Sequence, residues 1–413
     1  MNESQVDVVQ LQKRDPQAWT VLLSAQDGLA DVVVTAVVAQ PLKRNTSSTQ
    51  DSRHLTRYLV SLANHSDPIP FIGKKTTSIE ALFYRDLANA APSISPHCWY
   101  THVSDDQGWI ILDDVPNHVS VDKWQAADVE DVISQMTMLH TTFWNQPDLY
   151  QRHTWLPDFI GRKEKQYTWD ELRQDHAIYF EQGPAALLSD HALHHVGWLA
   201  PQFLEAANGL AVMQALGGWP GVLGESHLAA AADLIDDPVP MLEPLQRLPL
   251  TILHNRMYAY QWHITLFGDH RLLDWRNVVL GPGICDLIFF QEQFDLVNAN
   301  GSFPQVQFRQ NPPINEETLI DSYMLAMKTQ LGSLYDARLM RMAIPAARCL
   351  HILTHWFPHF ASWFDKMPDK YMWQRLNRMP EAELAERSLQ PMIVFRPHLK
   401  GVFQRFLQAY RML

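Results

Sequence analysis

The N-terminal part of the chain alternates short apolar runs with polar segments, a pattern that predicts β-strands. DVVVTAVVAQPL (31–42) and RYLVSLA (57–63) are rich in apolar and β-branched residues, and a polar segment (43–54) separates them. GWIILDDVP (108–116) is a further apolar run, and it leads into a polar elbow at Asp113–Asp114. We therefore expect a small β-rich lobe over residues 1–114.

Helical periodicity is present once within this lobe and dominates the rest of the chain. SIEALFYRDLANAAP (78–92) places its large apolar side chains on one helical face and ends at a proline. Longer helical patterns occupy residues 128–144, 228–238 and 315–357. These patterns predict one helix in the small lobe and a helical C-terminal lobe over residues 115–413.

One β-like segment interrupts the helical part. QWHITLFGDHRLLDW (261–275) has the alternation of a hairpin that turns at Gly268–Asp269. Together these elements predict an α+β fold with two lobes, in which the helical lobe carries a hairpin.

The amino-acid composition indicates which kinds of molecule this protein binds. The formal net charge of −12 argues against a general nucleic-acid binder and against adsorption to anionic membranes. The polar N-terminus has no signal-peptide core, and the three cysteines are far apart, as in cytosolic proteins. We therefore expect a cytoplasmic protein whose partner is a small molecule or another protein.

Four motifs, in this order, resemble the aminoglycoside phosphotransferase and choline-kinase-like family, which is related to the protein kinases. They are SIEALFYRDLA (78–88), ILDDV (111–115), MLHTTFW (138–144) and LLDWRNVVLGPGICDL (272–287). The nearest branch in pattern is that of the ecdysteroid-kinase-like proteins. The resemblance implies a protein-kinase-like fold whose ordinary activity is phosphoryl transfer from Mg·ATP.

The matching catalytic loop departs from the family pattern. The catalytic loop of the family has the pattern HGDxxxxN. His254-Asn255-Arg256 matches its HGD part, and Gln261 matches its final asparagine. The resemblance therefore implies that Arg256 replaces the aspartate that orients the acceptor hydroxyl, and that Gln261 replaces a metal-binding asparagine. The metal-binding aspartate of the family corresponds to Asp274.

The small lobe also departs from the pattern. The resemblance aligns the family's phosphate-binding lysine with Ser61, whereas its ion-pair partner is retained as Glu80. Asp114 follows the hinge strand and is a further expected cofactor contact, while a glycine-rich phosphate loop is represented only around Gly28. We therefore expect a degenerate nucleotide site.

Arg256 has two interpretations from the sequence. In the first, it holds an anionic ligand together with Arg276, with His254 and His263 nearby, because guanidinium groups bind phosphate and carboxylate well. In the second, it pairs with Asp274 or Asp286 and fills the vacated metal site. In the family pattern, Asp286 braces the catalytic loop through backbone N–H groups.

The segment HILTHWFPHF (351–360) combines histidines with aromatic residues. His351 and His355 are four residues apart, a spacing that two metal ligands use, although such spacings also arise by chance in a chain with 19 histidines. Trp356 belongs either to the core or to an aromatic-lined ligand pocket.

Three functions remain open. The first is a pseudokinase-like protein that binds a small anionic or aromatic ligand, and the second is an enzyme that carries out ATP-independent chemistry in the same cleft. Neither requires a cofactor. The third is a small-molecule kinase of unusual design, which requires Mg·ATP.

Overall fold

A computed structural model describes residues 7–26, 29, 31–42, 55–91, 93–115, 118–160, 167–175, 188–265, 267–298, 307–308, 312–364, 369–387 and 390–413. The chain divides into two compact units. The first, which contains the main sheet, comprises residues 1–142, 259–278 and 298–305, and the helical unit comprises the remainder. Among the described residues, no helix has the length and apolar character needed to cross a bilayer.

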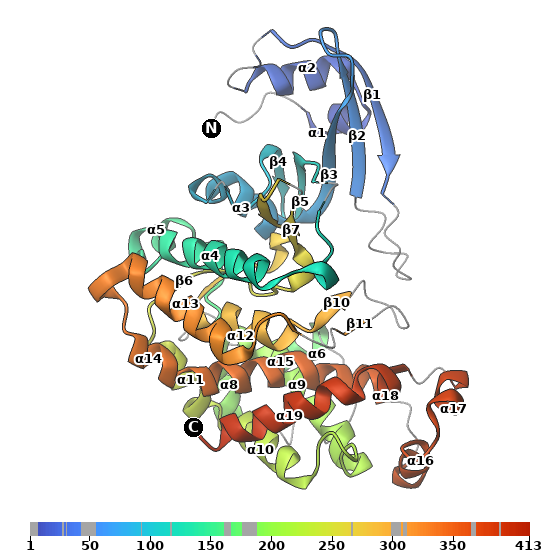
Figure 1. The fold of residues 1–413 in the computed structure, drawn as a ribbon, viewed down its shortest axis with the longest axis vertical. Helices are drawn as coiled ribbons and strands as arrows, with labels where there is room; N and C mark the ends of the chain where they lie inside the picture. Colours follow the sequence, from blue (N-terminus) through green and yellow to red (C-terminus); the bar gives the residue numbers. More distant parts are fainter. Residues whose placement is uncertain are drawn as a thin grey trace. The chain divides into compact units, whose positions relative to one another are not determined.

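The sheet-containing unit is built on five antiparallel strands in the order β1-β2-β3-β5-β4 (Figure 1). The strands are β1 (Val34–Pro41), β2 (Leu55–Leu62), β3 (Ile69–Thr77), β4 (Cys98–Ser104) and β5 (Gln107–Asp113). The apolar runs at 31–42, 57–63 and 108–116 correspond to β1, β2 and β5. Strands β3 and β4 were not expected from the sequence.

The two faces of this sheet have different partners because successive side chains of a strand point to opposite sides. Tyr58, Phe71 and Ile111 share one face and form a buried core with Trp19 of α2 (Pro16–Ser24). Helix α1 (Val8–Gln12) adds Leu11 to this core. The opposite face contains every second residue of β3, including Lys74.

Helix α3 (Ser78–Asp86) packs against that opposite face, where Gly108 leaves room for Ala81. A Cβ atom at position 108 would lie 2.6 Å from the Ala81 Cβ. The helix confirms the pattern seen at 78–92, and a 3-10 turn, η2 (Ala88–Ala90), follows it.

The expected hairpin is present, and it packs within the sheet-containing unit. Strands β7 (Trp262–Ile264) and β8 (His270–Leu272) pair across Gly268, whose φ is +86°. Leu272 N–H donates to Ile94 O (2.6 Å), and the Trp275 ring stacks on Phe83 of α3. These contacts place 259–278 with the sheet, so the compact units do not follow a single chain boundary at residue 114.

The other elements of this unit are α4 (Ala126–Thr142) and three 3-10 turns: η3 (Val121–Lys123), η5 (Ala259–Gln261) and η6 (Trp275–Asn277).

The helical unit is organised around the packing of α9 (Ala200–Leu216) against α15 (Ile344–Phe364). Gly209 makes this close approach possible, because a Cβ atom there would lie 1.7 Å from the Phe357 carbonyl oxygen. The other helices of this unit are α5 (Pro147–Arg152), α6 (Trp169–Asp175), α8 (Asp190–Val196), α10 (Glu225–Asp236), α11 (Val239–Gln246), α12 (Ile284–Gln293), α13 (Glu316–Leu331), α14 (Ala337–Met342), α16 (Lys370–Leu376), α17 (Glu381–Glu386), α18 (Gln390–Val394) and α19 (Arg396–Tyr410).

Two short strand pairs complete the described structure: β6 (Thr251–Leu253) with β9 (Val279–Gly281), and β10 (Leu296–Asn298) with β11 (Gln307–Phe308). The expected α+β class is therefore confirmed, with a small antiparallel sheet in one unit and a large helical unit.

Candidate functional site

Lys74 and Glu80 meet because β3 leads directly into α3. Thr77 caps the helix, and its hydroxyl accepts the Glu80 N–H (3.3 Å). Glu80 therefore lies in the first helical turn, with its side chain fully buried. Lys74 is on the sheet face that α3 covers, and its ammonium lies 2.7 Å from Glu80 Oε2.

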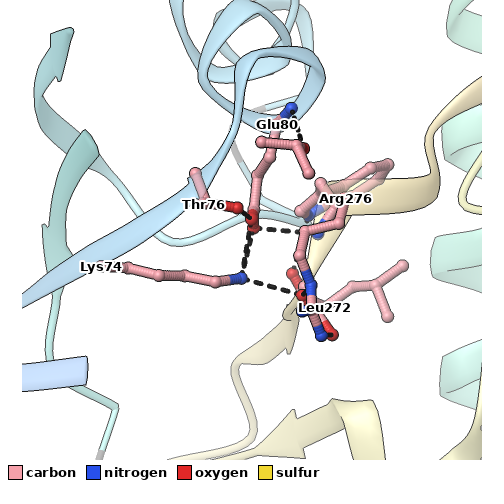
Figure 2. A network of polar contacts seen from close by, with 8 residues as sticks. Lys74, Thr76, Glu80, Leu272 and Arg276 are labelled. Atoms are coloured by element: carbon pink, nitrogen blue, oxygen red, sulfur yellow. Dashed lines mark hydrogen bonds and ion pairs between the residues drawn. The ribbon is translucent and has the colours of Figure 1, made fainter. Parts of the chain in front are cut away.

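The Glu80 carboxylate has two further donors. The Trp275 backbone N–H donates to Oε1 (3.1 Å), and the Thr76 hydroxyl donates to Oε2. Figure 2 shows Lys74 and Thr76 approaching this carboxylate from the strand. Such charge-assisted bonds satisfy a buried carboxylate that would otherwise be costly.

Asp274 is the second carboxylate of the site. Its backbone is left-handed (φ 70°, ψ 64°), a conformation that aspartate tolerates better than most residues, and it precedes η6. Lys74 Nζ lies 2.8 Å from Asp274 Oδ1, so one ammonium joins both carboxylates.

Arg276 binds the same carboxylate with two hydrogen bonds. Its Nε donates to Asp274 Oδ1 (2.6 Å) and a terminal nitrogen donates to Oδ2 (2.9 Å). Burial alone would raise the pKa of the Asp274 carboxyl, but Lys74 and Arg276 together hold that pKa well below its usual value. The Asp274 carboxylate therefore lies between two cations, Lys74 and Arg276.

The structure corrects the expected loss of the lysine. Ser61 pairs with Ala36 of β1, whereas the ammonium partner of Glu80 is Lys74 of β3. Lys74 is opposite Leu55 on β2, six residues from Ser61, a separation of roughly 20 Å along a strand. The sequence signal that was missed is a lysine in the strand immediately before the helix that carries Glu80.

The other expected contacts in this unit have local partners. The Asp114 carboxylate pairs with Arg57 (2.6 Å), and the Gln261 carbonyl accepts the Leu273 N–H (3.0 Å). His263 stacks on His118 with ring centroids 3.9 Å apart. Gly28 lies outside the described residues.

A magnesium ion does not fit the donor set at Asp274. Magnesium requires nearly ideal octahedral geometry and carboxylate oxygens at short distance. Both oxygens of Asp274 accept N–H groups from cations, and three of their four lone-pair positions are in use. The expected metal role of Asp274 therefore conflicts with the bonds that Asp274 makes.

In the helical unit, Asp286 holds the loop that follows β6. Its Oδ2 accepts the His254 N–H (2.7 Å) and its Oδ1 accepts the Asn255 N–H (2.8 Å). Both the Asp286 and the His254 side chains are fully buried, and Asn255 is left-handed with φ 63°. This confirms the expected bracing of the loop by Asp286, and it fixes the position from which Arg256 extends.

Arg256 is exposed, and in the helical unit its charge acts on Tyr258 and on His355 and His359 of α15. Burial is the main cause that lowers the pKa values of His355 and His359, and the Arg256 charge lowers both further. Among the described residues of this unit, Arg256 has no ion-pair partner, so the expected pair with Asp286 is absent. Asp274 instead bonds to Lys74 and Arg276.

The histidines of α15 form a stack with aromatic residues. The His351 and His355 rings are parallel, with centroids 5.0 Å apart, and His359 stacks on Trp363 at 5.2 Å. Trp356 is buried among Phe395 and His398. Among the described residues, no three or more His, Cys, Asp or Glu side chains form a group that could hold a metal ion.

Comparisons with known proteins give remote structural similarities. No family model and no curated protein matches the chain. A choline kinase from Cryptosporidium parvum Iowa II is 13% identical, with a TM-score of 0.46 over 92% of this chain and 99% of that chain. A spectinomycin phosphotransferase solved with ADP and spectinomycin is 10% identical, with a TM-score of 0.45 over 96% and 98% of the two chains.

An aminoglycoside phosphotransferase from Alicyclobacillus acidocaldarius is 11% identical, with a TM-score of 0.42 over 89% of this chain and 91% of that chain. These are structures of the enzyme classes that the sequence motifs resemble. With TM-scores below 0.5 they are no basis for assigning an activity to this chain.

Proposed function

We propose that this protein is a pseudokinase-like binder of a small anionic ligand, held by Arg256 beside His355 and His359. The observation that carries the proposal is the exposed guanidinium of Arg256, on a loop held by Asp286 and without a carboxylate partner among the described residues of its unit. An uncompensated guanidinium next to neutral imidazoles suits a phosphate, sulfate or carboxylate group.

Ordinary phosphoryl transfer is disfavoured by the same residue. The reaction requires a carboxylate that orients the acceptor hydroxyl, and the matching position holds Arg256. A guanidinium stays protonated in proteins, so it cannot accept the hydroxyl proton. Loss of a catalytic group of this kind costs orders of magnitude in rate.

The ion pairs of Lys74 favour a second candidate, a Mg·ATP-dependent small-molecule kinase of unusual design. Lys74 bridges Glu80 and Asp274, an arrangement compatible with holding nucleotide phosphates. This candidate requires a divalent metal at Asp274 and another group in place of the hydroxyl-orienting carboxylate.

Thermal-shift titrations with inorganic phosphate, pyrophosphate and Mg·ATP test the two candidates. A ligand that binds only the folded state raises stability by about 2.7 kcal/mol at a concentration of 100 Kd. We expect a shift with phosphate or pyrophosphate that Arg256→Gln abolishes. The matched control is Arg247→Gln, an exposed arginine of the same unit that pairs with Glu243.

A measurement of ATP consumption distinguishes a protein that only binds its ligand from one that catalyses phosphoryl transfer. We expect no ATP consumption with a panel of hydroxyl acceptors. A shift with Mg·ATP that survives Arg256→Gln, together with ATP consumption, would establish the kinase candidate and refute the proposal. No shift with any of the anions would also refute it.

A further inference from the structure

We infer that Arg276 supplies at Asp274 the positive charge that a divalent metal would supply, and that it excludes Mg²⁺ and Mn²⁺ from that carboxylate. The inference concerns the sheet-containing unit and does not depend on the anion proposed for Arg256. It makes Arg276 the residue that determines cation specificity at Asp274.

The bonding geometry is the first argument. Asp274 Oδ1 accepts from Lys74 Nζ (2.8 Å) and from Arg276 Nε (2.6 Å), and Oδ2 accepts from the Arg276 terminal nitrogen (2.9 Å). Two parallel N–H···O bonds between a guanidinium and a carboxylate are a strong and geometrically specific arrangement. A metal ion that bound through both oxygens of Asp274 would have to displace these two hydrogen bonds.

Charge balance is the second argument. Lys74 pairs with both Glu80 and Asp274, and Arg276 pairs with Asp274, so two cations already flank the Asp274 carboxylate. A divalent ion would add two positive charges beside two existing cations, and like charges within a few ångströms repel strongly in a poorly solvated site. The side chains of Lys74 and Asp274 are only 14% and 15% exposed, whereas that of Arg276 is 38% exposed, so water screens the repulsion from Lys74 least.

Chain connectivity is the third argument. Arg276 follows Asp274 by two residues, and η6 begins between them. Its guanidinium is therefore tethered to the carboxylate and acts at a high effective concentration, whereas a metal ion must compete from solution. The Trp275 ring, which stacks on Phe83, and its N–H, which donates to Glu80, hold this turn in place.

A titration of the full chain with Mn²⁺ alone, followed by electron paramagnetic resonance of the free ion, tests the inference. In the wild-type protein we expect no binding that depends on Asp274, so Asp274→Asn should leave the Mn²⁺ isotherm unchanged. Arg276→Ala should gain a site with Kd at least about tenfold tighter than any wild-type site. The double variant Arg276→Ala/Asp274→Asn should lose that gained site.

The matched control is Arg271→Ala. Arg271 is in the same hairpin, but its guanidinium donates to the Ser93 and His270 carbonyl oxygens. This variant should bind Mn²⁺ as the wild type does. A gain of the same size in Arg271→Ala would indicate a general charge effect and would overturn the specific role of Arg276.

Two results overturn the inference outright. One is an Mn²⁺ site in the wild type that Asp274→Asn removes, a comparison that stands even if Arg276→Ala does not fold. The other is a well-folded Arg276→Ala protein that gains no site. The change in melting temperature that phosphate causes should be the same in the Arg276→Ala variant and the wild type. A negative result in the Mn²⁺ titration is therefore distinguishable from a failure of the Arg256 proposal.

Discussion

The ammonium group of Lys74 lies 2.7 Å from the carboxylate of Glu80, although the two residues belong to different elements, β3 and α3. Glu80 is fully buried, and Lys74 is also its link to Asp274. The stability of this part of the sheet-containing unit therefore depends on a lysine that the sequence motifs did not identify.

Removal of this ammonium should destabilise the protein strongly. Lys74→Met leaves two carboxylates without a shared cation, and we expect a loss of about 3 kcal/mol in the free energy of unfolding, because breaking a buried pair strands its partner. The adjacent Lys75 is exposed on the opposite sheet face, so Lys75→Met should change stability by less than about 0.5 kcal/mol. Urea unfolding of both variants is the measurement, and equal losses would contradict the assigned role.

The brace of the Arg256 loop gives a second prediction. Asp286→Asn keeps the shape of the side chain but removes the charge and one of the two acceptors used by His254 N–H and Asn255 N–H. We expect a loss of about 2 kcal/mol, since a buried backbone donor is left unsatisfied. The loop also positions Arg256, so phosphate binding should weaken as well. An unchanged melting temperature, together with an unchanged thermal shift on adding phosphate, would show that Asp286 does not hold the loop in place.

Stability should fall in mildly acidic solution because of buried histidines of α15 and α19. Burial lowers the pKa values of His351, His359 and His398 to about 4, below the value near 6.5 of an unfolded chain. Between pH 4 and 6.5 the unfolded chain therefore binds protons that the folded chain does not. The free energy of unfolding should decrease as pH falls through this window, by up to about 1.4 kcal/mol per pH unit for each histidine.

Denaturant unfolding between pH 7.5 and 5 measures this slope above the range in which carboxylates titrate. Asp274 and Glu292, whose pKa values are lowered by their cationic partners against the effect of burial, lose their contribution only at lower pH. His359→Gln should show a shallower slope than the wild type, and the exposed His65→Gln should not. Identical slopes for wild type and His359→Gln would rule out this origin.

The contact between α9 and α15 gives the last prediction. Gly209→Ala would place a methyl group 1.7 Å from the Phe357 carbonyl oxygen, and backbone cannot move aside as a flexible side chain can. We expect a loss of at least about 3 kcal/mol from overpacking. Gly401→Ala in α19 is the control, because its nearest neighbour is the Arg405 side chain at 3.4 Å. Its stability should change by less than about 1 kcal/mol, and calorimetry of both variants makes the comparison.

The sequence by itself determined those elements that depend on patterns within a few neighbouring residues. The apolar runs of β1, β2 and β5, the one-sided helix α3 and the turn at Gly268 all follow from side-chain periodicity and backbone freedom within a few residues. The bracing role of Asp286 was likewise expected from the motif that contains it, and the structure confirms it.

Tertiary structure decided which charged groups meet. Strand register, which depends on pairing between distant residues, placed Lys74 rather than Ser61 beside Glu80. The left-handed turn at Asp274 directed Arg276 back onto that carboxylate. Sequence alone identified Arg256, Asp274 and Glu80 as candidates, but their partners depend on distances between chain segments that no local pattern encodes.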